Sequence, residues 1–167
     1  MDNLIAKADT LLEALPYIQR FRGKTFVIKY GGSFMDSTDS TVRSGMARDV
    51  VFLEAVGINP VVVHGGGKAI THALEQSGVE TRFEQGYRVT TPELVKVVEQ
   101  VLSREINPSI VSMINELGGK ARGFSGTEIF HCKPFRPLGH AGEPLDIGLV
   151  GEVTGVNTRA LLECIEQ

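Results

Sequence analysis

Two short apolar segments, each followed at once by glycines, constrain the fold of this chain more than any other feature. Thr25–Tyr30 precedes Gly31 and Gly32, and Pro60–His64 precedes Gly65-Gly66-Gly67. Both faces of these segments are apolar, as is typical of strands in a buried parallel sheet. Successive glycines cost conformational entropy, so they are best explained by a ligand that approaches the backbone. We therefore predict that the two turns lie side by side and form one anion-binding site.

A helical segment follows each strand, at 38–56 and at 68–77, and glycine ends both. This alternation of strand and helix predicts an α/β layer fold with a mainly parallel sheet. In such sheets, ligands bind outside the carboxyl ends of the strands, where the glycines lie.

The middle of the chain predicts a hairpin and then a long helix. Polar residues at 80–90 indicate a hairpin that turns at Gln85-Gly86. Thr90 or Thr91 caps the helix, with Pro92 in its first turn and Glu93 placed for a capping box. The helix should bend at Pro108 and continue to Leu117, and it can serve the core or a dimer interface.

The last third predicts shorter elements. Gly123-Phe124 and Glu128–Cys132 are interpreted as two antiparallel strands, and 134–144 as a loop. A strand at Leu149–Val153 and a helix at Val156–Cys164 follow.

The first segment, 4–19, predicts an amphipathic helix that Pro16 should kink or interrupt. Its apolar stripe comprises Leu4, Ala8, Leu11, Leu15 and Ile18. The helix packs either on its own domain or, as an arm, against another subunit.

Composition excludes several classes of function. The net charge of −3 gives no reason to expect nucleic acid or an anionic membrane as a partner. No apolar run is long enough to span a bilayer, and the first residues do not form a signal peptide. Cys132 and Cys164 lie far apart, so neither a disulfide framework nor a structural metal site is expected. These features predict a protein of the reducing cytoplasm.

Lys29 is the first candidate for chemistry, because it places a compact positive charge at the end of a strand beside glycines. Backbone N–H groups and the start of the next helix would add to this anion site. A lone lysine in this position is otherwise simply solvated. His64 is interpreted as a hydrogen-bonded structural residue rather than a base.

Two other interpretations of these motifs fail on spacing. His64-Gly65-Gly66-Gly67 also occurs in esterases, but no GxSxG nucleophile elbow accompanies it here. Gly23-Lys24-Thr25 looks like the end of a P-loop, but Ile18 occupies the place of its first glycine. Neither a hydrolase nor a P-loop enzyme is predicted.

Arg88, on the predicted hairpin, is the third candidate, after Lys29 and the turn His64-Gly65-Gly66-Gly67. A guanidinium beside the glycine turns could form a two-pronged contact with a substrate carboxylate.

Together these motifs resemble those of acetylglutamate kinases, a branch of the amino acid kinase family. The resemblance rests on the order and spacing of Phe26–Gly32, Val61–Gly67, Gly86–Thr90 and Gly148–Val153. It implies a three-layer α/β sandwich that transfers phosphate from ATP, with Mg²⁺, to the side-chain carboxylate of N-acetyl-L-glutamate.

The resemblance also implies roles for single residues. Lys29 would stabilise the transferring phosphoryl group, and Gly31 and Gly32 would contact phosphate through their N–H groups. Gly65, Gly66 and Gly67 would hold the substrate, and Arg88 would bind its α-carboxylate. Such a division suits phosphoryl transfer, which depends on positioning and charge stabilisation.

The leading helix resembles the extra helix of arginine-inhibited, hexameric members of this family. This implies a homodimer or hexamer formed through the leading and long helices, and an arginine effector near Tyr17. We expect two parts: an arm at 1–22 and an amino-acid-substrate domain at 23–167.

The resembling enzymes are nearly twice as long, and their second half binds ATP. We therefore expect that this chain lacks the ATP-binding half and is inactive alone. The alternative is an inactive half-kinase that serves as a binding or oligomerisation module.

Overall fold

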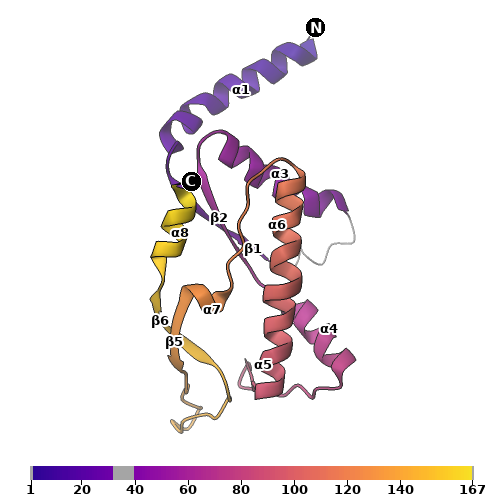
Figure 1. Cartoon of the computed structure of the whole chain (residues 1–167), viewed down its shortest axis with the longest axis vertical. Helices are drawn as coiled ribbons and strands as arrows, with labels where there is room; N and C mark the ends of the chain where they lie inside the picture. Colours follow the sequence, from indigo (N-terminus) through magenta and orange to yellow (C-terminus); the bar gives the residue numbers. More distant parts are fainter. Residues whose placement is uncertain (1, 32–39, 167) are drawn as a thin grey trace.

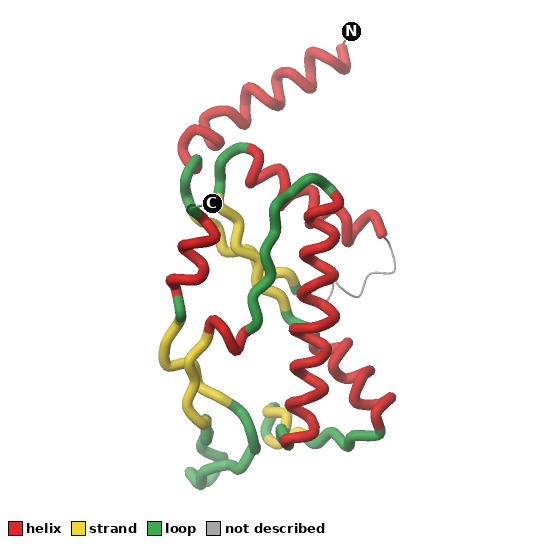
Figure 2. Tube along the Cα trace, in the orientation of Figure 1, coloured by secondary structure: helices red, strands yellow, loops and turns green. Residues whose placement is uncertain are grey.

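The computed structural model describes residues 2–31 and 40–166 (Figures 1 and 2). Its first elements alternate between helix and strand, as predicted. They are α1 (Asp2–Phe21), β1 (Thr25–Tyr30), α3 (Ser40–Ala55), β2 (Asn59–His64) and α4 (Gly67–Ser77). The first two residues of the helix expected at 38–56 lie outside the described part.

Strands β1 and β2 form a parallel pair, as the two apolar segments predicted. Thr25 pairs with Asn59 at one end and Tyr30 with His64 at the other. The carboxyl ends are therefore level, and the Gly65 N–H donates to the Tyr30 carbonyl oxygen at 3.4 Å. The register brings Gly31 beside the second glycine turn.

Within residues 2–31 and 40–166, helices cover one face of this strand pair and leave the other exposed. Tyr30 packs into the core cluster with residues of α3 and α6 (Asn107–Glu116). On the other face, Val27 is 72% exposed and Val63 is 46% exposed. The fold is therefore a mixed α/β arrangement, and the third layer of the expected sandwich is not evident among the described residues.

A small hairpin and a long helix follow, both as predicted. β3 (Phe83–Glu84) pairs antiparallel with β4 (Tyr87–Arg88) around Gln85-Gly86. Thr91 caps α5 (Pro92–Glu99) by accepting a hydrogen bond from the Leu94 N–H at 3.2 Å. This cap makes Glu93 the second helical residue, one short of the capping-box position. A backbone hydrogen bond, and then the Thr91 hydroxyl, lower the pKa of Glu93.

A π-helical segment, η1 (Gln100–Ile106), lies between α5 and α6, just before Pro108, where a bend was predicted. The Asn107 N–H donates to the Leu102 carbonyl oxygen, five residues back. Pro108 has no N–H to donate to the preceding turn, so the hydrogen-bond pattern must change there. The helix accommodates the proline by adopting the wider π-helical hydrogen-bond pattern and does not end there.

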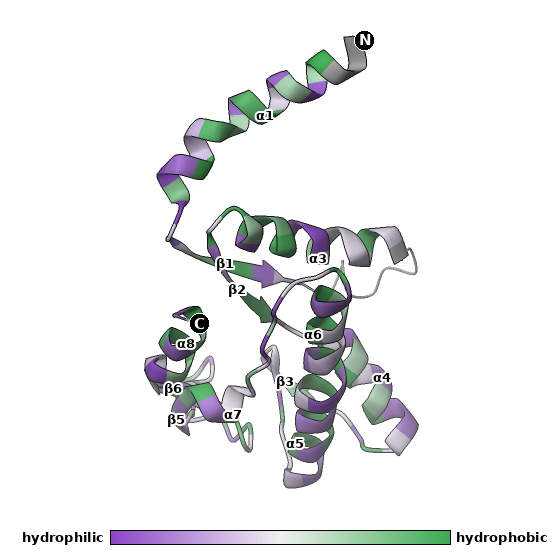
Figure 3. Ribbon diagram, turned by 45° about the horizontal axis from the view of Figure 1, so that its top comes forward, coloured by the Kyte–Doolittle hydropathy of each residue, from purple (hydrophilic) through white to green (hydrophobic). Residues whose placement is uncertain are grey.

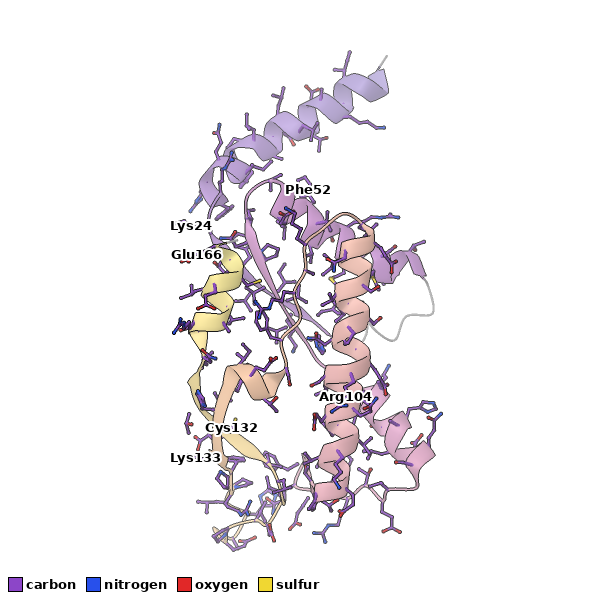
Figure 4. All side chains as sticks on the ribbon, in the orientation of Figure 1. Lys24, Phe52, Arg104, Cys132, Lys133 and Glu166 are labelled. Atoms are coloured by element: carbon purple, nitrogen blue, oxygen red, sulfur yellow. The ribbon has the colours of Figure 1, made fainter. Side chains whose placement is uncertain are left out.

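The described structure has no strand at Gly123-Phe124, and the strand predicted at Glu128–Cys132 begins two residues later, at Phe130. Ser125 and Glu128 form a capping box that starts a short helix, α7 (Gly126–Ile129). β5 (Phe130–Pro134) follows and pairs antiparallel with β6 (Gly151–Val156), after which α8 (Thr158–Ile165) closes the described chain. Cys132, labelled in Figure 4, is exposed on β5, and both cysteines are free.

Helix α1 projects away from the rest of the molecule (Figure 1). Leu11 and Leu12 are each 65% exposed, and Figure 3 shows apolar positions along the projecting helix. The helix runs through Pro16 without interruption. The Phe21 ring packs edge-on against Phe26, with 5.3 Å between centroids, and attaches its end to β1. Apart from this contact, α1 projects from the described part of the domain, and the arm remains a prediction.

None of the described helices combines the length and apolar character needed to cross a bilayer.

Candidate functional site

The candidate site begins where β1 and β2 end. Gly31 and Gly65 are neighbours there because the strands are parallel and level. Gly32 lies outside the described residues. Lys29 is exposed and faces Val63 across the strand pair. Alternation along the strand directs the Lys29 side chain to the face opposite the buried Tyr30.

The second glycine turn leads directly into α4. Gly66 is the N-cap and has no side chain to accept hydrogen bonds from the first turn of the helix. Uncapped N–H groups at a helix start attract anions, through both the N–H groups and the helix dipole. The start of α4 therefore has the chemistry that the glycine pattern predicted.

Gly66 is glycine for a steric reason. A Cβ atom there would lie 2.7 Å from both Leu102 Cδ2 and Ile106 Cδ1 of the π-helical segment. The turn and the π-helical segment can approach this closely only because Gly66 lacks a side chain.

Arg88 reaches the start of α4 through a hydroxyl group. Its Nη2 donates to Thr71 Oγ1 at 3.1 Å, and Thr71 Oγ1 donates to the Gly67 carbonyl oxygen at 3.0 Å. The guanidinium carbon lies 4.9 Å from the centre of the Phe83 ring, a cation–π distance. The structure thus brings Arg88 and Gly67, two predicted site residues, to opposite sides of one hydroxyl.

The second nitrogen of Arg88, Nη1, is buried and has no hydrogen-bond partner among the described residues. A buried donor without a partner is costly and calls for an explanation. An acidic ligand group bound against the guanidinium would supply the missing acceptor.

His64 takes part in a second network, as a structural residue. Its Nδ1 lies 3.1 Å from the Gly65 carbonyl oxygen, and its Nε2 lies 3.3 Å from Asn107 Nδ2. Asn107 Nδ2 also donates to the Phe124 carbonyl oxygen at 3.2 Å. Sequence reasoning missed both Thr71 and Asn107, because each acts through a contact with a distant segment.

The described residues offer no metal-binding cluster, and the groove described next lies away from the glycine turns. Among the described residues, no three histidine, cysteine or acidic side chains group to hold a metal ion. A shallow groove of about 400 Å³ lies elsewhere, beside the hairpin, and does not include the glycine turns. It is lined by Arg82, Val89, Thr90, Thr91, Pro92, Arg136, Asp146, Gly148 and Leu149.

Comparison of sequences shows which known proteins this chain is similar to. The profile of the amino acid kinase family matches residues 24–167. An acetylglutamate kinase of Akkermansia muciniphila is 48% identical over 98% of the chain, and one of Burkholderia cenocepacia is 49% identical over 90%. The chain covers 54% and 51% of these two proteins, so it spans about half the length of the curated relatives it matches.

Comparison of structures supports the fold. N-acetylglutamate synthase from Neisseria gonorrhoeae, complexed with coenzyme A and N-acetyl-glutamate, aligns with a TM-score of 0.68. It is 20% identical, and the alignment covers 95% of this chain and 35% of the synthase. The protein smu.665 from Streptococcus mutans aligns with a TM-score of 0.69 at 23% identity, over 86% of this chain and 55% of its own.

Proposed function

We propose a function from one premise: this chain belongs to the amino acid kinase family and is a homologue of acetylglutamate kinases. The proposed function is the binding of N-acetyl-L-glutamate in a kinase that phosphorylates its side-chain carboxylate with ATP, as in arginine biosynthesis. This chain would supply the part of the kinase that holds the amino-acid substrate.

The observation that carries the proposal is the placement of Arg88. Its guanidinium is linked through Thr71 to Gly67, at the start of α4, and Nη1 lacks a partner in the described part of the chain. A carboxylate that accepts from Nη1 would therefore lie near uncapped helical N–H groups. An N-acetylated amino acid offers such a carboxylate, together with an amide that backbone groups can bind.

The remaining candidate residues would contact different parts of the reactants. The N–H groups of Gly65, Gly66 and Gly67 would hold the substrate, and those of Gly31 and Gly32 would contact the phosphoryl group. Lys29 would add the positive charge that stabilises the transferring phosphoryl group.

The use of ATP and Mg²⁺ is inferred from membership of the kinase family alone. Phosphoryl transfer needs a metal ion to neutralise the charge of the phosphates. Because the described residues form no cluster of three metal-binding side chains, we derive no step in which they hold Mg²⁺.

Isothermal titration calorimetry with N-acetyl-L-glutamate tests the proposed site. Arg88→Ala should weaken binding about tenfold or more, because a carboxylate loses its charged partner. Arg82→Ala is the matched control: the exposed Arg82 lies beside the same hairpin and pairs with the half-buried Glu84 at 3.4 Å. Equal affinity of wild type and Arg88→Ala would remove Arg88 from the site.

The assembly is a further part of the proposal. The exposed face of the β1–β2 pair would be an inner face of a three-layer sandwich in the whole kinase, because parallel sheets are normally covered on both faces. Residues 1–22 would form an arm, joined to a domain at 23–167, that packs against a second copy of the protein. The exposed apolar stripe of α1 also favours the second candidate function, an oligomerisation module without catalysis.

A further inference from the structure

We propose that Asn107 is a positioning residue that fixes the tautomer of His64 and, through His64, the orientation of the peptide that opens the substrate-binding turn. This inference rests on the proposed function for its effect on substrate. The assignment of the His64 tautomer does not depend on the proposed function.

The hydrogen-bond partners of Asn107 determine which atom of its amide faces His64. The Phe124 carbonyl oxygen, 3.2 Å from the amide nitrogen, can only accept a hydrogen bond. The group that faces it must therefore be the NH₂ group, and the flipped amide is excluded. The second hydrogen of the same NH₂ group is then available to His64 Nε2 at 3.3 Å.

The partners of His64 determine its protonation in the same way. The Gly65 carbonyl oxygen, 3.1 Å from Nδ1, also only accepts, so Nδ1 carries the hydrogen. Nε2 faces a donor, so it must be the unprotonated, accepting nitrogen. The neutral Nδ1–H form is the one tautomer that satisfies all three contacts, and it leaves His64 without an N–H at Nε2.

The consequence for the site follows from the planarity of the peptide. The Gly65 carbonyl group and the Gly66 N–H group belong to one peptide plane and point in opposite directions. By donating to the Gly65 carbonyl oxygen, His64 therefore also fixes the direction of the Gly66 N–H, a proposed substrate donor. Glycine has no side chain to resist rotation of this peptide, so the turn depends on such a contact.

The packing around Asn107 restricts the position of its side-chain amide. A Cβ atom on Gly123 would collide with Asn107 Oδ1, so Gly123 leaves room for the amide. Asn107 begins α6 directly after the π-helical segment, whose Leu102 and Ile106 press against Gly66. Such π-helical segments occur frequently at functional sites. The π-helical segment thus packs against this turn directly, and Asn107 contacts it through His64.

The test is ¹⁵N NMR of the histidine imidazoles in the full 167-residue chain at mildly alkaline pH, where ordinary histidines are neutral. Wild type should show His64 as the Nδ1–H tautomer. Asn107→Asp replaces the donor by an acceptor of the same shape and should convert His64 to the neutral tautomer protonated at Nε2, which can no longer donate from Nδ1 to the Gly65 carbonyl oxygen. Asn115→Asp is the matched control, because Asn115 lies on the same helix and accepts from the Ala121 N–H through Oδ1, which aspartate retains.

Affinity for N-acetyl-L-glutamate, measured by calorimetry on the same proteins, completes the test. Asn107→Asp should bind about tenfold more weakly, and Asn115→Asp within about twofold of wild type. An Nε2–H tautomer in wild type would overturn the inference, even if the variant fails to fold. A changed tautomer with unchanged affinity would overturn the positioning role. The expected tautomer in a chain that binds no N-acetyl-L-glutamate would uphold the structural part and contradict the proposed function instead.

Discussion

Replacing Gly148 by alanine is expected to lower the free energy of unfolding by about 2–5 kcal/mol. Gly148 has a φ of +71°, and a Cβ atom there would collide with the Thr90 carbonyl oxygen. Left-handed backbone costs a non-glycine residue about 1–2 kcal/mol, and overpacking adds about 1–3 kcal/mol. Because the obstructing atom belongs to the backbone, no side-chain rotation can relieve the collision.

The collision would break a junction that supports the candidate site. The Thr90 N–H donates to the Ile147 carbonyl oxygen at 2.9 Å, and the Leu149 N–H donates to the Thr90 carbonyl oxygen at 2.7 Å. Thr90 follows Arg88 by two residues, so this junction holds the end of the hairpin. Hydrogen exchange at Thr90 and Leu149 should therefore accelerate in Gly148→Ala.

Gly142→Ala is the matched control for this prediction. Gly142 lies in the same loop with a φ of +85°, but nothing lies within 4 Å of the position of its Cβ. It should lose about 1–2 kcal/mol, the cost of left-handed backbone alone. Urea denaturation followed by circular dichroism measures both variants. Equal losses would show that the contact with Thr90 is not rigid.

The sequence predicted the elements whose pattern is local. β1, β2 and the helices after them follow from apolar runs ended by glycine, and the hairpin follows from Gln85-Gly86. The helix α7 was missed although its local signal, a serine followed by glutamate three residues later, was present at Ser125 and Glu128. The strand predicted at Glu128–Cys132 overlapped this helix at Glu128 and Ile129 and matched β5 from Phe130 onward.

Contacts between distant segments could not be predicted from pattern. Thr71 and Asn107 look like ordinary helical residues, and only the fold brings them to Arg88 and His64. Pairing of β5 with β6 also joins segments separated by a long loop. The residues that we propose to bind substrate or phosphate were thus visible in the sequence, whereas those that we propose to position them were not.

The chain is expected to self-associate in solution through the projecting helix α1, and charges on its apolar stripe should convert it to monomers. Leu11 and Leu15 lie one turn apart on this stripe, and both are exposed. An amphipathic helix of 20 residues that covers no core of its own gains stability by burying its apolar face against another surface. Two glutamates at an apolar interface would instead have to be desolvated, which is strongly unfavourable.

The measurement is light scattering coupled to size-exclusion chromatography on wild type and the double variant Leu11→Glu/Leu15→Glu. The control, Ala6→Glu/Thr10→Glu, makes the same change of charge on the opposite side of the helix, where both residues are exposed. Wild type and control should elute as the same oligomer, and the stripe variant at the mass of one chain. A monomeric wild type would contradict the role of α1 as an arm. Association that survives in the stripe variant would place the interface elsewhere, with the exposed face of β1 and β2, around Val27 and Val63, as the next surface to substitute.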